Sequence, residues 1–536
     1  MSFSFVYVLG DSLSDTGAFT LTTFGLTQDP ALTFPPPSLG YQGRFSDGPV
    51  AAEVLAELTG AEIAEDAIAL VPEAPAADLA AATLGILRPE SSFAYGSARA
   101  VGTRTLADAA AGTGLEAELA ADPLLLAAAQ SFDINLGAQA DRLAATLAGG
   151  APENALATIF IGLNDFQDFA PSNPFFAPFE GLALVGDILE ATEDAARAAA
   201  GLGIGTVALF TLPSPEVFPP APGVPVDESA LALLDVLTGV HALGLGAMAA
   251  ELRGEGVDAR VVDLRSMAAA VDADPGGYGL VTLDVVSVFG TGALGAPNPA
   301  AAAFEPDELG FFDNIHFSGA LHGVFGAFAA RTLSSETRFL GDGGNLRIYG
   351  SDDHLVFGEG GDDLLFGGGG GDALFGGTGE DGLFGGASHD LLAGGGGDDL
   401  LRGGTGGDVL AGGAGDDAAR GNGGADLLLT TEGADLAHGG GGDDVVAIDL
   451  SGDVAGARLR GGRGADALVV IGADAAFGGD LEAALAAAGV SVSGFEVLAD
   501  GFGGALAEGD ARWARLQEAA FWGLFDAAGA VAPPLG

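Results

Sequence analysis

Residues 358–384 read GEGGDDLLF, GGGGGDALF and GGTGEDGLF, three successive nonapeptides close to the form Gly-Gly-x-Gly-x-Asp-x-Leu-x. The register continues along the chain, with an aspartate at the sixth position of ten repeats and an apolar residue two positions later. The aspartates are Asp363, Asp372, Asp381, Asp390, Asp399, Asp408, Asp417, Asp426, Asp435 and Asp444. A flexible glycine-rich linker needs neither the fixed spacing nor the apolar eighth position, so the region is predicted to fold as a repeat domain.

This pattern resembles the RTX calcium-binding repeat. The resemblance implies a parallel β-roll, in which two nonapeptides form one coil and the apolar eighth positions fill the interior. Coils stack at about 4.8 Å, so aspartates one coil apart are separated by roughly twice a calcium–oxygen distance of about 2.4 Å. The ten aspartates are therefore predicted to bind structural Ca²⁺. Because glycines favour the unfolded chain and carboxylate rows repel one another, folding is expected to require the ion.

The composition changes near residue 340, which indicates a domain boundary. Before it, short apolar runs predict buried strands at Phe5–Leu9, Thr158–Ile161, Thr206–Phe210 and Arg260–Leu264, with alanine-rich helices between them. This alternation predicts an α/β sandwich with a parallel sheet. We expect a catalytic domain at 1–338, the repeat roll at 339–470 and a C-terminal segment at 471–536.

The charge balance restricts the partners of the chain. The formal net charge is −55, and all 19 basic residues are arginine. Such a surface repels nucleic acid and attracts divalent cations. The absence of cysteine excludes disulfides and thiolate chemistry. The acidity fits either adaptation to high salt or the composition common in exported proteins.

Four short segments before residue 320 combine the groups that acyl transfer needs. GDSL at 10–13 places Ser12 after the first strand, FAYGSA at 93–98 contains Gly96, IGLND at 161–165 contains Asn164, and FDNIH at 312–316 contains Asp313 and His316. A serine hydroxyl needs a neighbouring base, the base needs a group that orients it, and the tetrahedral intermediate needs fixed donors around its oxygen.

These segments resemble the four sequence blocks of the GDSL, or SGNH, lipase and esterase family, closest to its bacterial lipase, lecithinase and haemolysin branch. The resemblance implies the SGNH three-layer sandwich, with Ser12 as nucleophile, His316 as general base and Asp313 orienting His316. The oxyanion hole would combine the amides of Ser12 and Gly96 with the side chain of Asn164. No cofactor is expected for the ester chemistry itself.

Export is expected from the same resemblances. RTX-like proteins commonly leave the cell through type I secretion machinery, guided by an uncleaved C-terminal signal, which we expect together with a roll cap in 471–536. The N-terminus lacks the pattern of a cleaved secretory signal, and no run of about 18 apolar residues predicts a transmembrane segment. The expected location is extracellular.

The sequence favours a secreted ester hydrolase that acts on lipid or other acyl esters. Within this class a lipase, a phospholipase or haemolysin, a short-chain esterase and a carbohydrate deacetylase stay open. The alternative from another class is a calcium-binding surface or adhesion protein whose hydrolase-like domain is inactive. Ser12, Asn164 and His316 are all present, which favours the enzyme.

Overall fold

The computed structural model divides into two compact units, Met1–Asp272 with Val281–Leu333, and Ala273–Leu280 with Ser334–Gly536. The residues that the structure describes are 3–11, 50–62, 98–111, 114–121, 123–169, 177–219, 228–273, 275, 278, 280–286, 288–289, 296–298, 301, 304, 309–311, 316–341, 343–472, 480–500, 502, 505–506, 515–516, 519 and 522.

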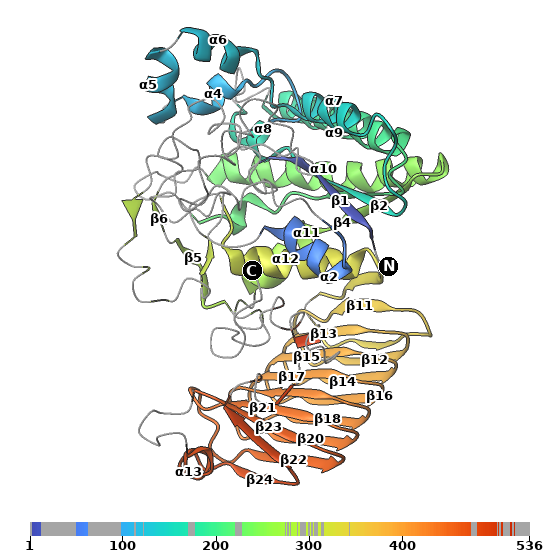
Figure 1. The fold of residues 1–536 in the computed structure, drawn as a ribbon, viewed down its shortest axis with the longest axis vertical. Coiled ribbons are helices and arrows are strands. Elements are labelled where there is room, and N and C mark those ends of the chain that lie inside the picture. The colour runs from blue at the N-terminus through green and yellow to red at the C-terminus, as the bar shows by residue number, and fades with distance from the viewer. Residues whose placement is uncertain are drawn as a thin grey trace. The chain divides into compact units, whose positions relative to one another are not determined.

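A four-stranded parallel sheet forms the centre of the first unit (Figure 1). Its order is β1 (Phe5–Gly10), β2 (Ala155–Phe160), β3 (Thr206–Phe210) and β4 (Asp258–Val262). Because helices cover both faces, the first three strands are almost entirely buried, which is why they read as continuous apolar runs. Each of the four predicted strands corresponds to one of these, and the predicted α/β fold with a parallel sheet is confirmed.

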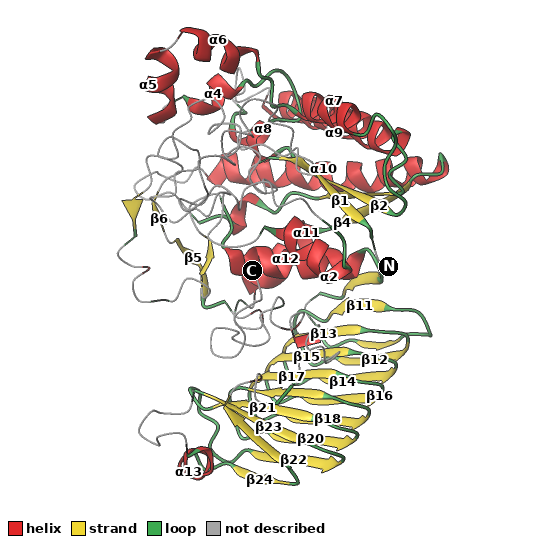
Figure 2. Cartoon of the chain, in the orientation of Figure 1, coloured by secondary structure: helices red, strands yellow, loops and turns green. Residues whose placement is uncertain are grey.

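Helices form a layer on each face of this sheet (Figure 2). One layer contains α7 (Leu136–Thr146), α9 (Ala177–Gly201) and α10 (Glu228–Gly254), and the other contains α2 (Ala51–Thr59), α11 (Leu264–Ala273) and α12 (Gly319–Thr332). Shorter helices are α4 (Leu106–Ala110), α5 (Gly114–Ala121), α6 (Pro123–Ser131), α8 (Leu163–Gln167) and the 3₁₀ helix η4 (Pro215–Val217). The result is a three-layer sandwich.

Two further features of this unit lie outside the central sheet. The strand β5 (Thr282–Val286) pairs with β8 (Leu309–Phe311), and β6 (Val288–Phe289) pairs with β7 (Ala296–Pro297). Helix α10 is long and apolar enough to cross a membrane by length and composition alone. It packs against α9 and β4, so these two criteria do not establish a membrane-spanning role.

The second unit is a parallel β-roll made of two facing sheets (Figure 1). One sheet has the order β10 (Leu346–Ile348), β12 (Leu364–Gly369), β14 (Gly382–Ala387), β16 (Leu400–Thr405), β18 (Ala418–Gly423), β20 (Leu436–Gly441), β22 (Arg458–Arg463) and β24 (Ser491–Ser493). The other has the order β9 (Glu336–Phe339), β11 (His354–Phe357), β13 (Ala373–Thr378), β15 (Leu391–Gly396), β17 (Val409–Ala414), β19 (Leu427–Thr430), β21 (Val445–Asp449), β23 (Ala467–Ile471) and β25 (Val497–Asp500). The predicted β-roll is confirmed.

The interior of the roll consists of the residues two positions after each repeat aspartate. Neighbouring strands within a sheet pair residues 18 apart, as Leu365 with Leu383, so successive eighth positions lie one above another. Both leucines are fully buried. C-terminal to the repeats, helix α13 (Leu481–Ala487) contributes Leu485 to the same core. Each coil buries its apolar residues only against its neighbours, so the stack is stable only as a whole.

The two sheets differ on their outward faces. In the nine-stranded sheet the outward column is apolar and buried, and it includes Phe357 and Phe375. The Trp522 ring packs against both, with centroids 6.1 Å and 4.6 Å away. The outward face of the eight-stranded sheet is half-buried to exposed. Trp522 and Tyr278, whose ring centroid lies 6.3 Å from that of Phe375, therefore cover part of the nine-stranded sheet.

Candidate active site and calcium-binding rows

The structure describes two of the five predicted active-site residues, Asn164 and His316. Ser12, Gly96 and Asp313 lie outside the described residues, and their roles stay predictions. Main chain next to Ser12 is described up to Asp11, and the segment after Gly96 is described from residue 98.

The strand that leads to Ser12 is held by a side chain from α7. Gln139 is fully buried. Its side-chain oxygen accepts the Gly10 amide at 2.8 Å, and its nitrogen donates to the Gly10 carbonyl at 2.8 Å and to the Ile134 carbonyl at 3.0 Å. The amide of Asp11 then donates to the last carbonyl of β2 at 3.2 Å. The main chain is therefore fixed up to the residue before the predicted nucleophile.

A glycine turns the chain from β2 into α8. Gly162 has φ = +117°, and a Cβ atom there would lie 3.3 Å from the Leu212 side chain and 3.4 Å from that of Ile188, so glycine alone fits this turn without strain. The turn brings Asn164 into α8, where its side-chain nitrogen donates to the Ala98 carbonyl at 2.9 Å. An asparagine amide carries two N–H donors, so this bond leaves the second one for another acceptor.

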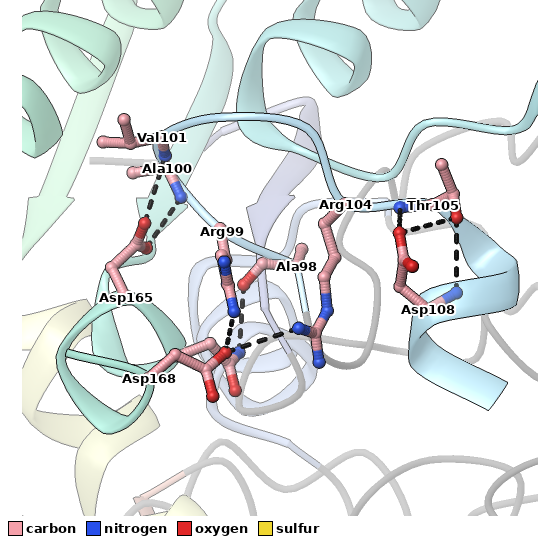
Figure 3. Close-up of polar contacts among 10 residues, drawn as sticks. Ala98, Arg99, Ala100, Val101, Arg104, Thr105, Asp108, Asp165 and Asp168 are labelled. Atoms are coloured by element: carbon pink, nitrogen blue, oxygen red, sulfur yellow. Dashed lines mark hydrogen bonds and ion pairs between the residues drawn. The ribbon is translucent and has the colours of Figure 1, made fainter. Parts of the chain in front are cut away.

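The neighbouring Asp165 holds the same segment more firmly (Figure 3). Its carboxylate accepts the amides of Ala100 at 2.8 Å and Val101 at 3.2 Å. The side chain is buried. Burial raises the pKa of Asp165 to about 6, although the two amide bonds favour the charged form. Asp165 is therefore a structural group in this geometry.

A surface ion pair completes the junction between α8 and the segment after Gly96 (Figure 3). Asp168 pairs with Arg99, and with Arg104 at 3.3 Å. Its side chain is 44% exposed, so this pair contributes little to stability. Three side chains in and directly after α8, those of Asn164, Asp165 and Asp168, thus contact Ala98, the last residue of the second predicted block, and the segment 99–104 that follows it. The structure therefore places the third block against the end of the second block and the segment that follows it.

His316 lies between β8 and α12 and is buried. The next residue, Phe317, is fully buried, bridges β8 and stacks on Phe218 with ring centroids 5.8 Å apart. The hydroxyl of Ser318 accepts an amide of the first turn of α12 at 3.2 Å. The backbone on the C-terminal side of His316 is therefore fixed by packing and by a helix cap.

The carboxyl ends of adjacent parallel strands lead to these groups. β1 ends next to Asp11, β2 leads through Gly162 to Asn164, and β3 leads through η4 to Phe218, which stacks on Phe317, the residue after His316. Ligands of open parallel sheets bind at this edge. An amide donor and an imidazole at the edge where a serine follows β1 suit acyl transfer.

In the roll, the predicted calcium aspartates form two continuous rows. Each backbone amide donates to the Oδ1 atom of the aspartate one coil further on, as Asp381 does to Asp399 at 2.7 Å. One row runs from Asn345 through Asp363, Asp381, Asp399 and Asp417 to Asp435. The other runs from His354 through Asp372, Asp390, Asp408, Asp426, Asp444 and Asp466 to Glu496.

The second carboxylate oxygens point into small oxygen-lined spaces. Among the described residues, buried Oδ2 atoms without a hydrogen-bond partner belong to Asp363, Asp372, Asp381, Asp399, Asp408, Asp417, Asp426 and Asp466. A Cβ atom on Gly376 would collide with the Asp381 Oδ2 and the Gly394 carbonyl oxygen of the next coil. A carboxylate and a carbonyl oxygen therefore face one space. This donor set fits Ca²⁺, which prefers several oxygen ligands.

The carboxylates of the two rows are spread along the roll rather than clustered. Within the described ranges, no three carboxylate or imidazole side chains gather at one point. Backbone carbonyl oxygens that face the carboxylates, such as that of Gly394 beside Asp381, would supply part of the coordination. Burial raises the pKa of Asp399 to about 7 and that of Asp417 to about 8, because the carboxylates are desolvated and face one another. A bound cation would favour their charged forms.

Four residues with clear roles were missed as site residues in the sequence. Asp466 and Glu496 continue one aspartate row. The signal for Asp466 was the repeat at 461–468. This repeat is four residues out of phase, because the row steps by 22 positions from Asp444 to Asp466 instead of the usual 18. Gln139 and Asp165 hold main-chain segments of the active site. Their role depends on tertiary contacts with residues 64 to 129 positions away, which no local pattern reveals.

Comparisons with protein families agree with these two units. The model described as GDSL-like lipase/acylhydrolase matches residues 6–327. The model described as RTX calcium-binding nonapeptide repeat (4 copies) matches residues 348–383, 384–419 and 420–449, which include all ten predicted calcium aspartates. No curated protein matches the sequence.

Proposed function

The chain belongs to the GDSL-like lipase/acylhydrolase family, and we propose that it is a secreted serine ester hydrolase that cleaves acyl esters through an acyl-enzyme intermediate. Ser12 is the nucleophile, His316 the general base and Asp313 the group that orients His316. The amides of Ser12 and Gly96 and the side chain of Asn164 form the oxyanion hole.

The proposed reaction has two halves. The Ser12 hydroxyl attacks the ester carbonyl while His316 takes its proton, and the tetrahedral intermediate collapses as His316 returns the proton to the departing alcohol. Water then attacks the acyl-enzyme with the same base and releases the acid. Negative charge on the carbonyl oxygen develops in both halves, so fixed N–H donors accelerate both.

The observation that carries the proposal is the junction between the second and third blocks. The Asn164 side chain is anchored on the Ala98 carbonyl, two residues after Gly96, and Asp165 accepts the amides of Ala100 and Val101. Oxyanion donors must be positioned before reaction, because reorganising them during the reaction costs free energy. Asp165 also stabilises the fold, so the discrimination rests on Asn164: an inactive relative has no need to keep this amide together with Ser12 and His316, and their joint presence favours the enzyme over the adhesion protein.

Calcium has a structural role in this proposal. The aspartate rows would hold Ca²⁺ with carbonyls of the glycine turns, and the ion supplies charge neutralisation that lets the coils stack. We further propose that the roll folds after export, because calcium is scarce in the cytoplasm and plentiful outside the cell. Type I secretion through a signal within 471–536 fits this order of events.

Covalent labelling tests the proposed nucleophile directly. A fluorophosphonate should react with the calcium-loaded wild type, and mass spectrometry should map the adduct to the peptide that contains Ser12. Ser12→Ala should remain unlabelled, whereas the matched control Ser14→Ala should label as the wild type does. An adduct on another serine, or equal labelling of Ser12→Ala, would refute the assignment.

A further inference from the structure

The outward face of the eight-stranded sheet carries a straight column of basic side chains. Strand pairing places Arg402 beside Arg420, then His438, then Arg460, each one coil from the last. All four are exposed. Arg458 is exposed on the same strand as Arg460. We call these five residues the cationic stripe.

These cations are unusual in a chain of net charge −55 with only 19 basic residues. Among the described residues, none of the four arginines of the stripe forms an ion pair, although elsewhere Arg197, Arg260 and Arg265 do so. Arg402 and Arg420 place like charges directly opposite each other on adjacent strands, about 4.8 Å apart, and such a pair destabilises a sheet. The roll therefore retains a repulsive arrangement that its own acidic residues do not neutralise.

A packing contact accounts only for Arg402, the first arginine of the column in chain order. Phe366 and Phe384 stack with centroids 4.6 Å apart, and the Arg402 guanidinium lies 5.6 Å from the Phe384 ring. This contact orients Arg402. The arginines further along the column, Arg420 and Arg460, have no aromatic partner among the described residues. Their position on a flat, exposed sheet points to a ligand instead.

The geometry of the stripe selects among anionic ligands. It is narrow, because Asp362, Glu380, Asp398 and Asp416 form an exposed acidic row where the strands of the same sheet begin. A planar anionic membrane would meet this row together with the stripe. A single extended chain would contact the cations alone. The described cationic coils also lack the exposed aromatic rings on which nucleic-acid bases stack.

We propose that the cationic stripe binds a linear anionic polysaccharide that carries a carboxylate on each sugar. Guanidinium groups bind carboxylates through paired charge-assisted hydrogen bonds, and the regular strand spacing presents them to a ligand whose charges recur at a similar interval. The interval from Arg402 to Arg460 is three strand spacings, about 14 Å. The stripe thus accommodates about four sugars, and it works independently of the ester chemistry.

Length-dependent binding of uronic-acid oligosaccharides tests the proposal. Oligogalacturonates of about two to about eight sugars are titrated against the full calcium-loaded chain at fixed low salt and calcium. Affinity should rise to about four sugars and then level off, since three strand spacings set the length. A neutral galactose oligomer of equal length should not bind. Absence of oligogalacturonate binding at millimolar concentration would overturn the proposal.

Matched arginine variants locate the site. Arg420→Gln should weaken binding about tenfold, as loss of one charge-assisted pair predicts, and Arg402→Gln with Arg420→Gln and Arg460→Gln should abolish it. Arg347→Gln removes an equal charge from the first coil of the same sheet and should leave binding unchanged. Calcium-induced β-structure, measured by circular dichroism, shows that each variant folds. Equal losses in Arg420→Gln and Arg347→Gln would contradict a specific stripe.

Two other ligands are tested in the same series. Vesicles with anionic lipid should bind no more strongly than neutral vesicles, and a single-stranded thymidine oligomer should bind more weakly than an oligogalacturonate of similar charge. If either binds more tightly than the oligosaccharide, and does so through Arg420, the polysaccharide assignment is wrong.

Discussion

The carboxylate of Asp165 accepts the backbone amide of Ala100 at 2.8 Å, so a side chain of the third sequence block holds the main chain that follows the second. Val101 donates to the same carboxylate at 3.2 Å. Buried carboxylates are costly unless their charge is compensated. The two amides supply that compensation, and they fix the segment beside Asn164.

Asp165→Asn should weaken this junction. The asparagine oxygen can accept one amide, but its NH₂ group would face the other amide N–H, leaving a buried donor unsatisfied. We expect a loss of about 2 kcal/mol in the free energy of unfolding of the hydrolase unit, with a lower kcat. Urea unfolding and ester hydrolysis measure the two effects. The control Asp168→Asn, at an exposed ion pair, should cost less than about 1 kcal/mol; equal losses would contradict the assignment.

Gln139→Leu should impair catalysis from a distance. The leucine has a similar volume but leaves the amide and carbonyl of Gly10 and the carbonyl of Ile134 without their partner, so the strand end before Ser12 loses its fixed position. We expect kcat to fall by about tenfold or more with little change in KM, because a misplaced nucleophile slows the chemical step. Gln130→Leu, at an exposed position on α6, is the matched control. An unchanged kcat would disprove the positioning role.

Removal of calcium should unfold the roll. Asp399→Asn should raise the calcium concentration needed for folding, whereas Asp398→Asn, at the neighbouring exposed aspartate, should change it little. Circular dichroism during a calcium titration measures both midpoints. Indistinguishable midpoints would argue against the buried rows as the calcium ligands.

The same titration should depend on pH. The pKa values of Asp399 and Asp417, about 7 and about 8 without a cation, lie above the ordinary value, so protons compete with calcium below these values. The calcium midpoint should therefore fall as the pH rises from 6 to 8. A midpoint that is constant over this window would contradict the raised pKa values.

His241 should make the hydrolase unit sensitive to acid. His241 belongs to α10, and its side chain is buried. Neither ring nitrogen forms a hydrogen bond with a described residue, and desolvation lowers the pKa of His241 to about 4. The pKa of His241 in the folded state lies below the ordinary 6.5. The neutral side chain therefore contributes fully to stability above pH 6.5, and the free energy of unfolding falls by about 3 kcal/mol as the pH drops towards 4. The free energy of unfolding of His241→Leu, measured relative to that of the wild type, should be higher at pH 5 than at pH 8. Urea midpoints that differ equally at both pH values would refute this.

The roll was predictable from sequence because its rule is local and repeats. The aspartate and leucine positions recur every nine residues, and each makes the same contact in every coil, so the sequence predicted both the fold and the rows. The predicted row ended two residues too early, at Asp444, because an insertion before β22 shifts Asp466 out of phase and Glu496 lies beyond the repeats. A search for the motif without a fixed register would have included Asp466.

The hydrolase unit was predictable in its strands and in the identity of its motifs, but not in what fixes them. Apolar runs predicted β1 to β4 because buried parallel strands need apolar residues on both faces. Gln139 lies in a helix that resembles any other amphipathic helix, and only the fold brings it to Gly10. Asp165 stood in a recognised motif, yet its partners, Ala100 and Val101, carry no side-chain signal.

Hydrolysis of p-nitrophenyl esters by the calcium-loaded wild type and Ser12→Ala tests the central claim most directly. The account predicts turnover by the wild type and a loss of about 10⁴-fold or more in kcat for Ser12→Ala, with both proteins showing the same calcium-induced folding. Comparable rates in the two proteins, or no turnover of any acyl ester by a wild type that folds with calcium, would contradict it.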